Sequence, residues 1–161
     1  MRARGLVLVA AAIALGSGCV AHDAAFTASA SVAMQDSLRT TLDAFRRASS
    51  ASQWDSVSHM YADDSTFRWI EDGRVVARSA TVLRQHLLAM PASTRVETTY
   101  DSVEYLPIAP GVGSVTTRYT TAVKDSSGGG YSFGGILTMT FVHRPNGWRI
   151  VSGHTSSPRS H

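Results

Sequence analysis

His154 is the side chain in this sequence that best suits proton transfer, because an imidazole titrates near neutral pH. It lies in the last β-favouring run of the chain, where strand geometry places alternate side chains on one face. That face would carry Trp148, Ile150, Ser152, His154 and Ser156, and it changes from apolar to polar along the strand. Such a gradient is typical of a pocket wall with a dry floor and a polar mouth. A structural histidine is the first interpretation there, ligand contact the second, and acid or base catalysis the third.

Aromatic residues are the other candidates for contact with a ligand. Trp54, Tyr61, Phe67 and Trp69 lie close together in the sequence and could line a cavity. Aromatic side chains also carry much of the packing of any hydrophobic core. Core packing is therefore the alternative interpretation for each of the four.

The apolar run 112–124 adds one more candidate, whose position depends on strand register. The bulkier alternate set of its side chains includes Tyr119, so we expect Tyr119 beside the cavity and Arg118 outside it. A register inversion near Gly113 would exchange the two, because a one-residue slip turns every side chain to the other face. Arg118 would then be an internal anchor for an anion or carboxylate.

Other kinds of site have no signature in this chain. The six histidines show no tight metal-binding spacing, and His86 is interpreted as a partly exposed helix residue. Gly128 to Gly130 and Gly134-Gly135 are interpreted as a turn and a bulge, not as a phosphate loop. No serine nucleophile motif or reactive cysteine is evident. We therefore expect no metal and no other cofactor.

The elements that must position these residues are helices first and long strands later. Apolar periodicity predicts helices over 34–50, from about Trp54 to Tyr61, and over 79–90, the last with a buried stripe of Val82, Leu83, Leu87 and Met90. Alternation and turn residues predict strands over 65–70, 74–77, 95–106, 112–124 and 131–144, and a last strand after an Asn146-Gly147 hairpin turn. This order predicts an α+β fold in which helices cover one face of a curved antiparallel sheet.

The first residues predict export. A basic start, an apolar run over 6–15 and small residues before Cys19 are typical of a secretory signal peptide over 1–18. Cys19 resembles the lipidated cysteine of a bacterial lipoprotein, but Leu15 lies four residues before it where three are usual, so ordinary cleavage after Ala21 stays open. We expect a cell-envelope, periplasmic or secreted protein, with a flexible tether over 19–33, the domain over 34–156 and a tail over 157–161.

Charge gives no indication of a nucleic-acid partner. The chain has 161 residues, 43% of them hydrophobic and 17% charged, which is typical of one globular domain. Of its 15 Lys and Arg, cleavage removes Arg2 and Arg4, leaving 13 against 12 Asp and Glu. A domain so nearly neutral lacks the basic surface that binds nucleic acid.

Two segments, together with this order of elements, resemble the nuclear transport factor two-like superfamily. They are Met60-Tyr-Ala-Asp-Asp-Ser-Thr-Phe67 and Asn146-Gly-Trp-Arg-Ile-Val-Ser-Gly-His-Thr-Ser156. The nearest resemblance is to SnoaL-like proteins and to the calcium/calmodulin-dependent kinase association domain, and it covers residues 34–156. It implies a cone, in which three N-terminal helices pack on a strongly bent antiparallel sheet of about six strands and enclose a cavity.

The resemblance leaves function open, because the superfamily holds isomerases, dehydratases, hydrolases and non-catalytic association domains. In ketosteroid isomerases that resemble this region, a general-base aspartate followed by proline aligns with Trp69 and Ile70. Trp69 cannot shuttle a proton, so that mechanism is not expected. Asp63 and Asp64 are interpreted as turn or capping residues.

From these features we expect an exported domain that binds a small, largely apolar molecule and has no clear catalytic apparatus. The expected ligand-binding residues are Trp54, Tyr61, Phe67, Trp69, Tyr119, His154 and Ser156. One alternative is an isomerase, dehydratase or hydrolase that uses His154 with Tyr119 or Asp64. The other is a homo-oligomeric association module that pairs through Thr116, Arg118 and Thr120. We expect a homodimer that meets a membrane only through a lipid anchor.

Overall fold

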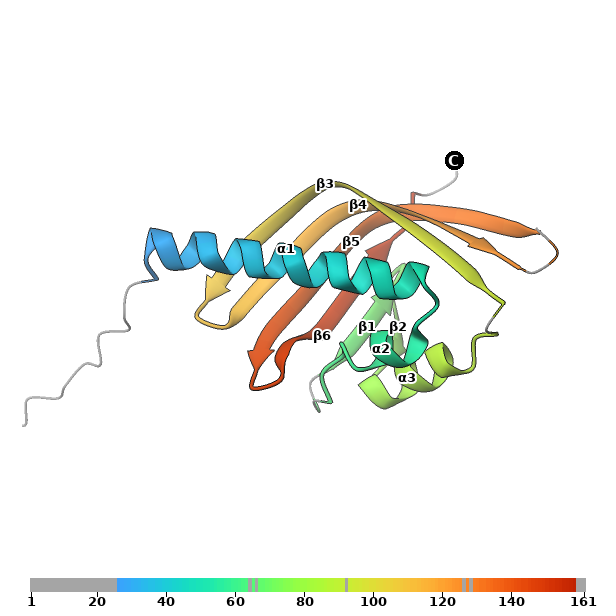
Figure 1. Ribbon diagram of the computed structural model, residues 1–161, viewed down its shortest axis with the longest axis horizontal. Coiled ribbons are helices and arrows are strands. Elements are labelled where there is room, and N and C mark those ends of the chain that lie inside the picture. The colour runs from blue at the N-terminus through green and yellow to red at the C-terminus, as the bar shows by residue number, and fades with distance from the viewer. Residues whose placement is uncertain are drawn as a thin grey trace, which may run out of the picture.

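The computed structural model describes residues 26–63, 65, 67–91, 93–125, 127 and 129–158. The proposed signal segment with Cys19, and also Asp64, therefore lie outside the described residues. The elements follow in the order α1 (Ala28–Ser50), α2 (Trp54–Ser58), β1 (Arg68–Glu71), β2 (Arg74–Ala77), α3 (Ala80–Leu88), β3 (Arg95–Ala109), β4 (Val112–Lys124), β5 (Gly130–Arg144) and β6 (Gly147–Ser156) (Figure 1).

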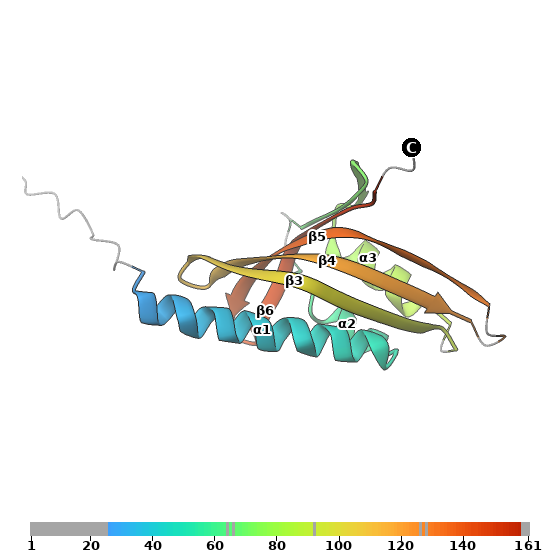
Figure 2. The ribbon, with the colours of Figure 1, turned by 90° about the horizontal axis from the view of Figure 1, so that it is seen from above.

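The six strands form one sheet in the order β2-β1-β6-β5-β4-β3. Every neighbouring pair is antiparallel except β1 and β6, which run parallel. The long strands bend, and α1 packs along β3 and β4 on one face of the sheet (Figures 1 and 2). This confirms the predicted α+β fold, with helices on one face of a bent sheet, and corrects the all-antiparallel expectation at one strand pair.

Helix α1 begins at Ala28, so the prediction of a flexible tether up to residue 33 is wrong for residues 28–33. Thr27 caps the helix, because its Oγ1 accepts a hydrogen bond of 3.1 Å from the backbone N–H of Ala30. Ala28, Ala30 and Ala33 favour a helix here, because alanine has the highest intrinsic helix propensity, and they extend a helix whose buried residues begin at Met34. Phe26, just before the cap, packs against the hydrophobic core.

Helices α2 and α3 are short and lie beside each other near the β1–β2 hairpin. Ser79 caps α3, since its Oγ accepts from the N–H of Val82 at 3.4 Å. The expected buried stripe of α3 is only partly correct: Leu83, Leu87 and Met90 are half-buried, whereas Val82 is exposed. Arg84 ties α3 to the end of α2 by donating to the carbonyl oxygens of Ser58 (2.9 Å) and Tyr61 (2.7 Å).

The core joins α1 to the middle of the sheet. Leu38 and Leu42 of α1 are completely buried. Gly113 of β4 allows this close approach, because a Cβ at that position would lie 2.6 Å from Cδ1 of Leu38. Trp148, at the start of β6, adds a polar link by donating from Nε1 to Oγ of Ser37 at 2.7 Å. The terminal hairpin is thereby attached to the long helix.

Candidate functional site

A cavity of about 420 Å³ lies between the helices and the inner face of the sheet. Every layer of the fold contributes to its wall, and most of the side chains are apolar or aromatic. The lining residues are Phe45, Ser49, Trp54, Val57, Tyr61, Trp69, Glu71, Asp72, Leu87, Met90, Val96, Thr98, Tyr100, Tyr119, Thr121, Val123, Tyr131, Phe133, Leu137, Thr155 and Ser157. The volume and the apolar wall are typical of a site for a small organic molecule.

Tyr61 is the centre of the aromatic wall. Its ring meets those of Phe45, Phe67 and Trp69 edge to face, with centroids 6.1, 5.9 and 5.8 Å away. The backbone beside it is held to β6, because Ala62 N–H donates to the carbonyl of Ile150 at 2.8 Å. Burial raises the pKa of the Tyr61 phenol well above its ordinary value, and the neighbouring phenol of Tyr100 adds to that rise. The hydroxyl therefore stays protonated and neutral at physiological pH.

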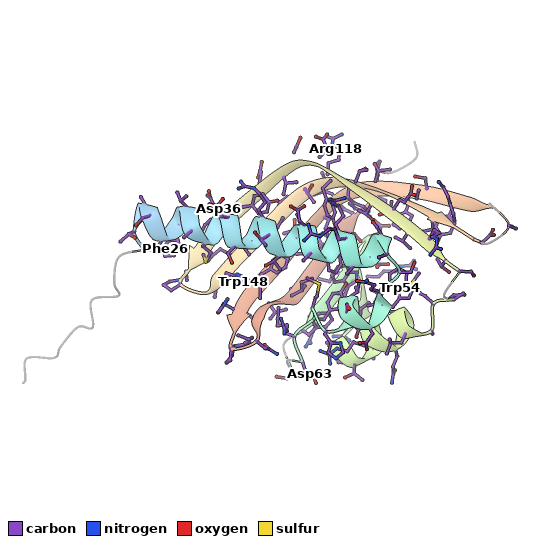
Figure 3. The ribbon with its side chains drawn as sticks, viewed as in Figure 1. Phe26, Asp36, Trp54, Asp63, Arg118 and Trp148 are labelled. Carbon is purple, nitrogen blue, oxygen red and sulfur yellow. The ribbon has the colours of Figure 1, made fainter. Side chains whose placement is uncertain are left out.

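Strand β4 has the register that its alternation predicted. Val115, Thr117, Tyr119 and Thr121 are buried on the inner face, whereas Arg118 is exposed. In Figure 3 Arg118 projects from the outside of the sheet, away from α1 and Trp54. Tyr119 thus lines the cavity, and the alternative of an internal anion anchor at Arg118 is excluded by the geometry.

Strand β6 departs from the predicted alternation, so the expectation that Ser152, His154 and Ser156 share a face with Trp148 and Ile150 is wrong. Ile150 pairs with Phe141 and Ser152 with Thr140, which leaves Val151 as an extra residue in β6. This bulge reverses the facing of every later side chain. Trp148 and Ile150 are buried, but His154 is exposed and stands on the outer face.

The bulge also explains how Trp69 joins the cavity wall. After it, Gly153 and Thr155 face inward, and Gly153 pairs with Trp69 of β1. A Cβ at Gly153 would overlap the six-membered ring of the Trp69 indole. Glycine is therefore required for the indole to lie flat against β6. Nε1 of Trp69 donates to Oε1 of Glu71 at 2.9 Å, which fixes the ring further.

The expected ligand-binding residues are thus only partly brought together. Trp54, Tyr61, Trp69 and Tyr119 line the cavity. Phe67 is completely buried behind Tyr61 and does not reach the cavity, because it packs in the core. His154 and Ser156 lie on the outer face, and Ser156 borders a separate hollow there. His86 of α3 is exposed, in agreement with its interpretation.

Sequence reasoning missed several cavity residues on β3, the strand at one edge of the sheet. Tyr100 follows Val96 and Thr98 at a spacing of two in β3, and all three line the cavity. That spacing could have identified them. Burial raises the pKa of the Tyr100 phenol well above its ordinary value; Arg46 opposes this rise and Tyr105 adds to it. The hydroxyl groups of Thr98 and Thr121 form a hydrogen bond of 2.9 Å with each other.

Trp54 carries a polar group that has no hydrogen-bond partner among the described residues. Its side chain is 8% exposed, and its indole Nε1 is buried without a hydrogen bond to any described residue. Leaving a buried donor unpaired costs about 1–3 kcal/mol. Because Trp54 lines the cavity, the acceptor that would satisfy this donor could come from a bound molecule.

The described part of the chain contains neither a cluster of metal-binding side chains nor a helix that could span a membrane. There, no three or more His, Cys, Asp and Glu side chains lie close enough together to hold a metal ion. None of the described helices is both long and apolar enough to cross a membrane.

Known structures define the class of this fold. A nuclear transport factor 2 (NTF2-like) superfamily protein from Salmonella enterica serovar Typhimurium is 12% identical and covers 80% of this chain and 94% of its own, with a TM-score of 0.66. The association domain of C. elegans CaMKII is 17% identical over 78% of this chain and 96% of its own (TM-score 0.60). The beta subunit of benzoate 1,2-dioxygenase from Burkholderia mallei is 17% identical and covers 75% of this chain and 88% of its own, with a TM-score of 0.62. The protein thus has the NTF2-like fold.

Within that class, the model of the SnoaL-like domain family matches residues 38–160. The chain therefore belongs to the SnoaL-like domain family. No curated protein matches the chain.

Proposed function

We propose that this SnoaL-like domain binds a small, largely apolar molecule in the cavity between its helices and its sheet. The observation that carries the proposal is the aromatic wall of that cavity, in which the buried Trp54 N–H has no acceptor among the residues that the structure describes. A ligand that fits this wall has an apolar, ring-sized body and one oxygen able to accept from the indole. From residues 1–21 we further propose that the domain is exported. The intact mass of the mature chain would distinguish lipid on Cys19 from cleavage after Ala21.

The enzymatic alternative that pairs His154 with Tyr119 loses its support. Tyr119 faces the cavity, whereas His154 stands on the outer face of the sheet. The two side chains therefore cannot act on one bound substrate, because a general acid or base must be within hydrogen-bond reach of the group that reacts. The other proposed partner, Asp64, lies outside the described residues.

Filling the cavity should weaken binding without unfolding the protein. Leu87 of α3 lines the cavity, and Leu88 beside it is exposed and does not. We expect Leu87→Trp to weaken binding of the neutral apolar dye N-phenyl-1-naphthylamine by at least about tenfold, because the indole would occupy the space that the dye needs. Fluorescence titration of the dye measures this. Leu88→Trp is the matched control and should bind the dye like the unaltered protein; equal binding by both variants would contradict the proposal.

A pair of ligands of the same shape tests whether the Trp54 N–H donates to the ligand. 1-Acetylnaphthalene carries a carbonyl acceptor, and the hydrocarbon 1-isopropenylnaphthalene has a CH2 group in its place. Trp54→Phe keeps an aromatic ring and removes the N–H. It should therefore lower the affinity for the ketone by about three- to tenfold, which corresponds to the usual contribution of one hydrogen bond. The hydrocarbon should bind both proteins alike. Competition against the dye measures each affinity, and equal losses for both ligands would show that the donor plays no part.

A second proposal concerns the outer face, where we propose that two copies of the chain pair. An open hollow of about 720 Å³ lies on this face, and Arg118, Thr120, Phe133 and Ile136 are among the residues that line it. Ile136, which pairs with the outward-facing Arg118, is 42% exposed and gives this face an apolar side chain that a second copy could cover. Ser156, one of the proposed ligand-binding residues, borders this hollow instead.

Substitution of Ile136 by a charged residue examines this pairing. Ile136→Glu should raise the dimer dissociation constant by at least about tenfold, because a carboxylate would be desolvated in the interface. Val75→Glu, on the edge strand β2 and similarly exposed at 43%, should leave it unchanged. Sedimentation equilibrium over a dilution series measures both. A monomer throughout the micromolar range would exclude the association module.

A further inference from the structure

Two carboxylates are the only charged side chains among the described residues that line the cavity. Glu71 ends strand β1 and Asp72 begins the turn that follows it. Both residues are exposed, and so is Ser157, whose backbone N–H donates to Asp72, so this part of the wall lies at the opening of the cavity. The described residues of the lining include no Lys, Arg or His, so the charge that they present to a ligand at this opening is negative.

Both carboxylates are held in place by hydrogen bonds but not neutralised. Oε1 of Glu71 accepts from Nε1 of Trp69 at 2.9 Å, and Oδ1 of Asp72 accepts from the backbone N–H of Ser157 at 2.6 Å. The donors are uncharged groups. Within the described residues, the ion pairs of the protein involve neither carboxylate. Two negative charges therefore stand side by side at the opening without a cation.

Aromatic rings stand next to these charges. Trp69 donates a hydrogen bond to Glu71, and Tyr119 lines the same cavity with its hydroxyl near the Thr155 side chain. Burial raises the pKa of the Tyr119 phenol; the Thr155 hydrogen bond opposes the rise, and the charges of Asp72 and Glu71 add to it. The field of both carboxylates thus reaches the Tyr119 hydroxyl. Carboxylates next to electron-rich aromatic rings form an environment that attracts a cation.

We infer that the ligand of this cavity is an apolar amine, whose ring-sized body lies against the aromatic wall and whose positively charged nitrogen meets Glu71 and Asp72 at the opening. This inference rests on the proposed binding function and specifies the class of ligand. Trp54, which is more than nine-tenths buried in the same wall, could donate a hydrogen bond from its indole N–H to an oxygen on the apolar body. A molecule with a carboxylate at the same end would meet like charges there and be repelled.

Three naphthalene ligands that differ in the polar group on one methylene carbon test the inference on the full-length chain. They are 1-naphthylmethylamine, which is a cation at pH 7, the neutral 1-naphthylmethanol, and the anion 1-naphthylacetate. Isothermal titration calorimetry at low salt should show the amine binding about tenfold more tightly than the alcohol, because it gains both the carboxylates and the ring faces. The carboxylate should bind most weakly.

Two double variants separate the local charge from the charge of the whole protein. Glu71→Gln with Asp72→Asn keeps the carbonyl oxygens that accept from Trp69 and Ser157, and it should lower the affinity for the amine to that for the alcohol. Asp36→Asn with Glu104→Gln removes the same charge from residues outside the cavity, and it should preserve the tenfold preference. Equal binding of amine and alcohol by the unaltered protein, or a preference that survives the first variant, would overturn the inference but leave the binding function. Failure of all three ligands to bind would contradict both.

Discussion

Phe67→Ala is expected to lower the free energy of unfolding by about 3–5 kcal/mol, the usual cost of deleting a buried phenylalanine side chain. Phe67 is completely buried, and its ring packs edge to face against Tyr61 at a centroid distance of 5.9 Å. Alanine would leave a void behind the central ring of the cavity wall. Urea denaturation followed by tryptophan fluorescence measures the change.

Two further variants make this expectation specific to burial at Phe67. Phe67→Leu fills most of the space and should cost clearly less than alanine. Val75→Ala changes a residue that is 43% exposed and should stay within about 0.5 kcal/mol of the unaltered protein. If Phe67→Ala also cost less than about 1 kcal/mol, the side chain would not belong to the core, and the original view of Phe67 as a ligand contact would regain support.

Raising the pH above 10 is expected to destabilise the domain steeply. An unfolded chain loses the proton of each tyrosine near pH 10. In the fold, burial raises the pKa of Tyr61 and Tyr100 well above that value, so the folded state binds more protons than the unfolded state above pH 10. Stability is therefore full below about pH 10 and falls as the pH rises further, by up to about 1.4 kcal/mol per pH unit for each of the two groups.

Urea denaturation at a series of pH values from 9 to 12 measures this slope by far-ultraviolet circular dichroism. The double variant Tyr61→Phe with Tyr100→Phe keeps both rings and removes both titrating hydroxyls. Other groups that titrate in this range are common to both proteins, so the difference in slope belongs to the two phenols. Parallel slopes would show that Tyr61 and Tyr100 ionise in the fold as readily as in the unfolded chain.

The comparison of β4 with β6 shows how far alternation predicts a site. In β4 the bulkier alternate set is buried over its central residues, and Tyr119 faces the cavity as predicted. In β6 the same rule fails after Val151, because the bulge depends on how two strands pair and not on the apolar pattern of one. Gly153 was the available signal, since a glycine within a strand often marks a bulge or a close contact.

The sequence pattern also predicts which face of a strand a side chain lies on better than how deeply that side chain is buried. Phe67 and Trp69 are two residues apart and were expected to line the cavity together, yet Trp69 reaches it and Phe67 does not. Which of two side chains on one face is deeper depends on the elements that pack over them, here the segment with Tyr61. For the same reason, Glu71 and Asp72 read as ordinary turn residues until the fold places them beside an aromatic cavity.

The position of β6 in the sheet has a consequence for the order in which the domain can form. Of the six strands in this sheet, β6 is the last to be synthesised, yet it lies between β1 and β5. The β1–β2 hairpin therefore has no place in the sheet until residues 147–156 are available, and the pairing of β1 with β6 closes a long loop of chain. Until then the aromatic wall around Tyr61 is exposed to solvent. A growing or C-terminally truncated chain thus presents the very surface that can aggregate, and its protection depends on the final strand.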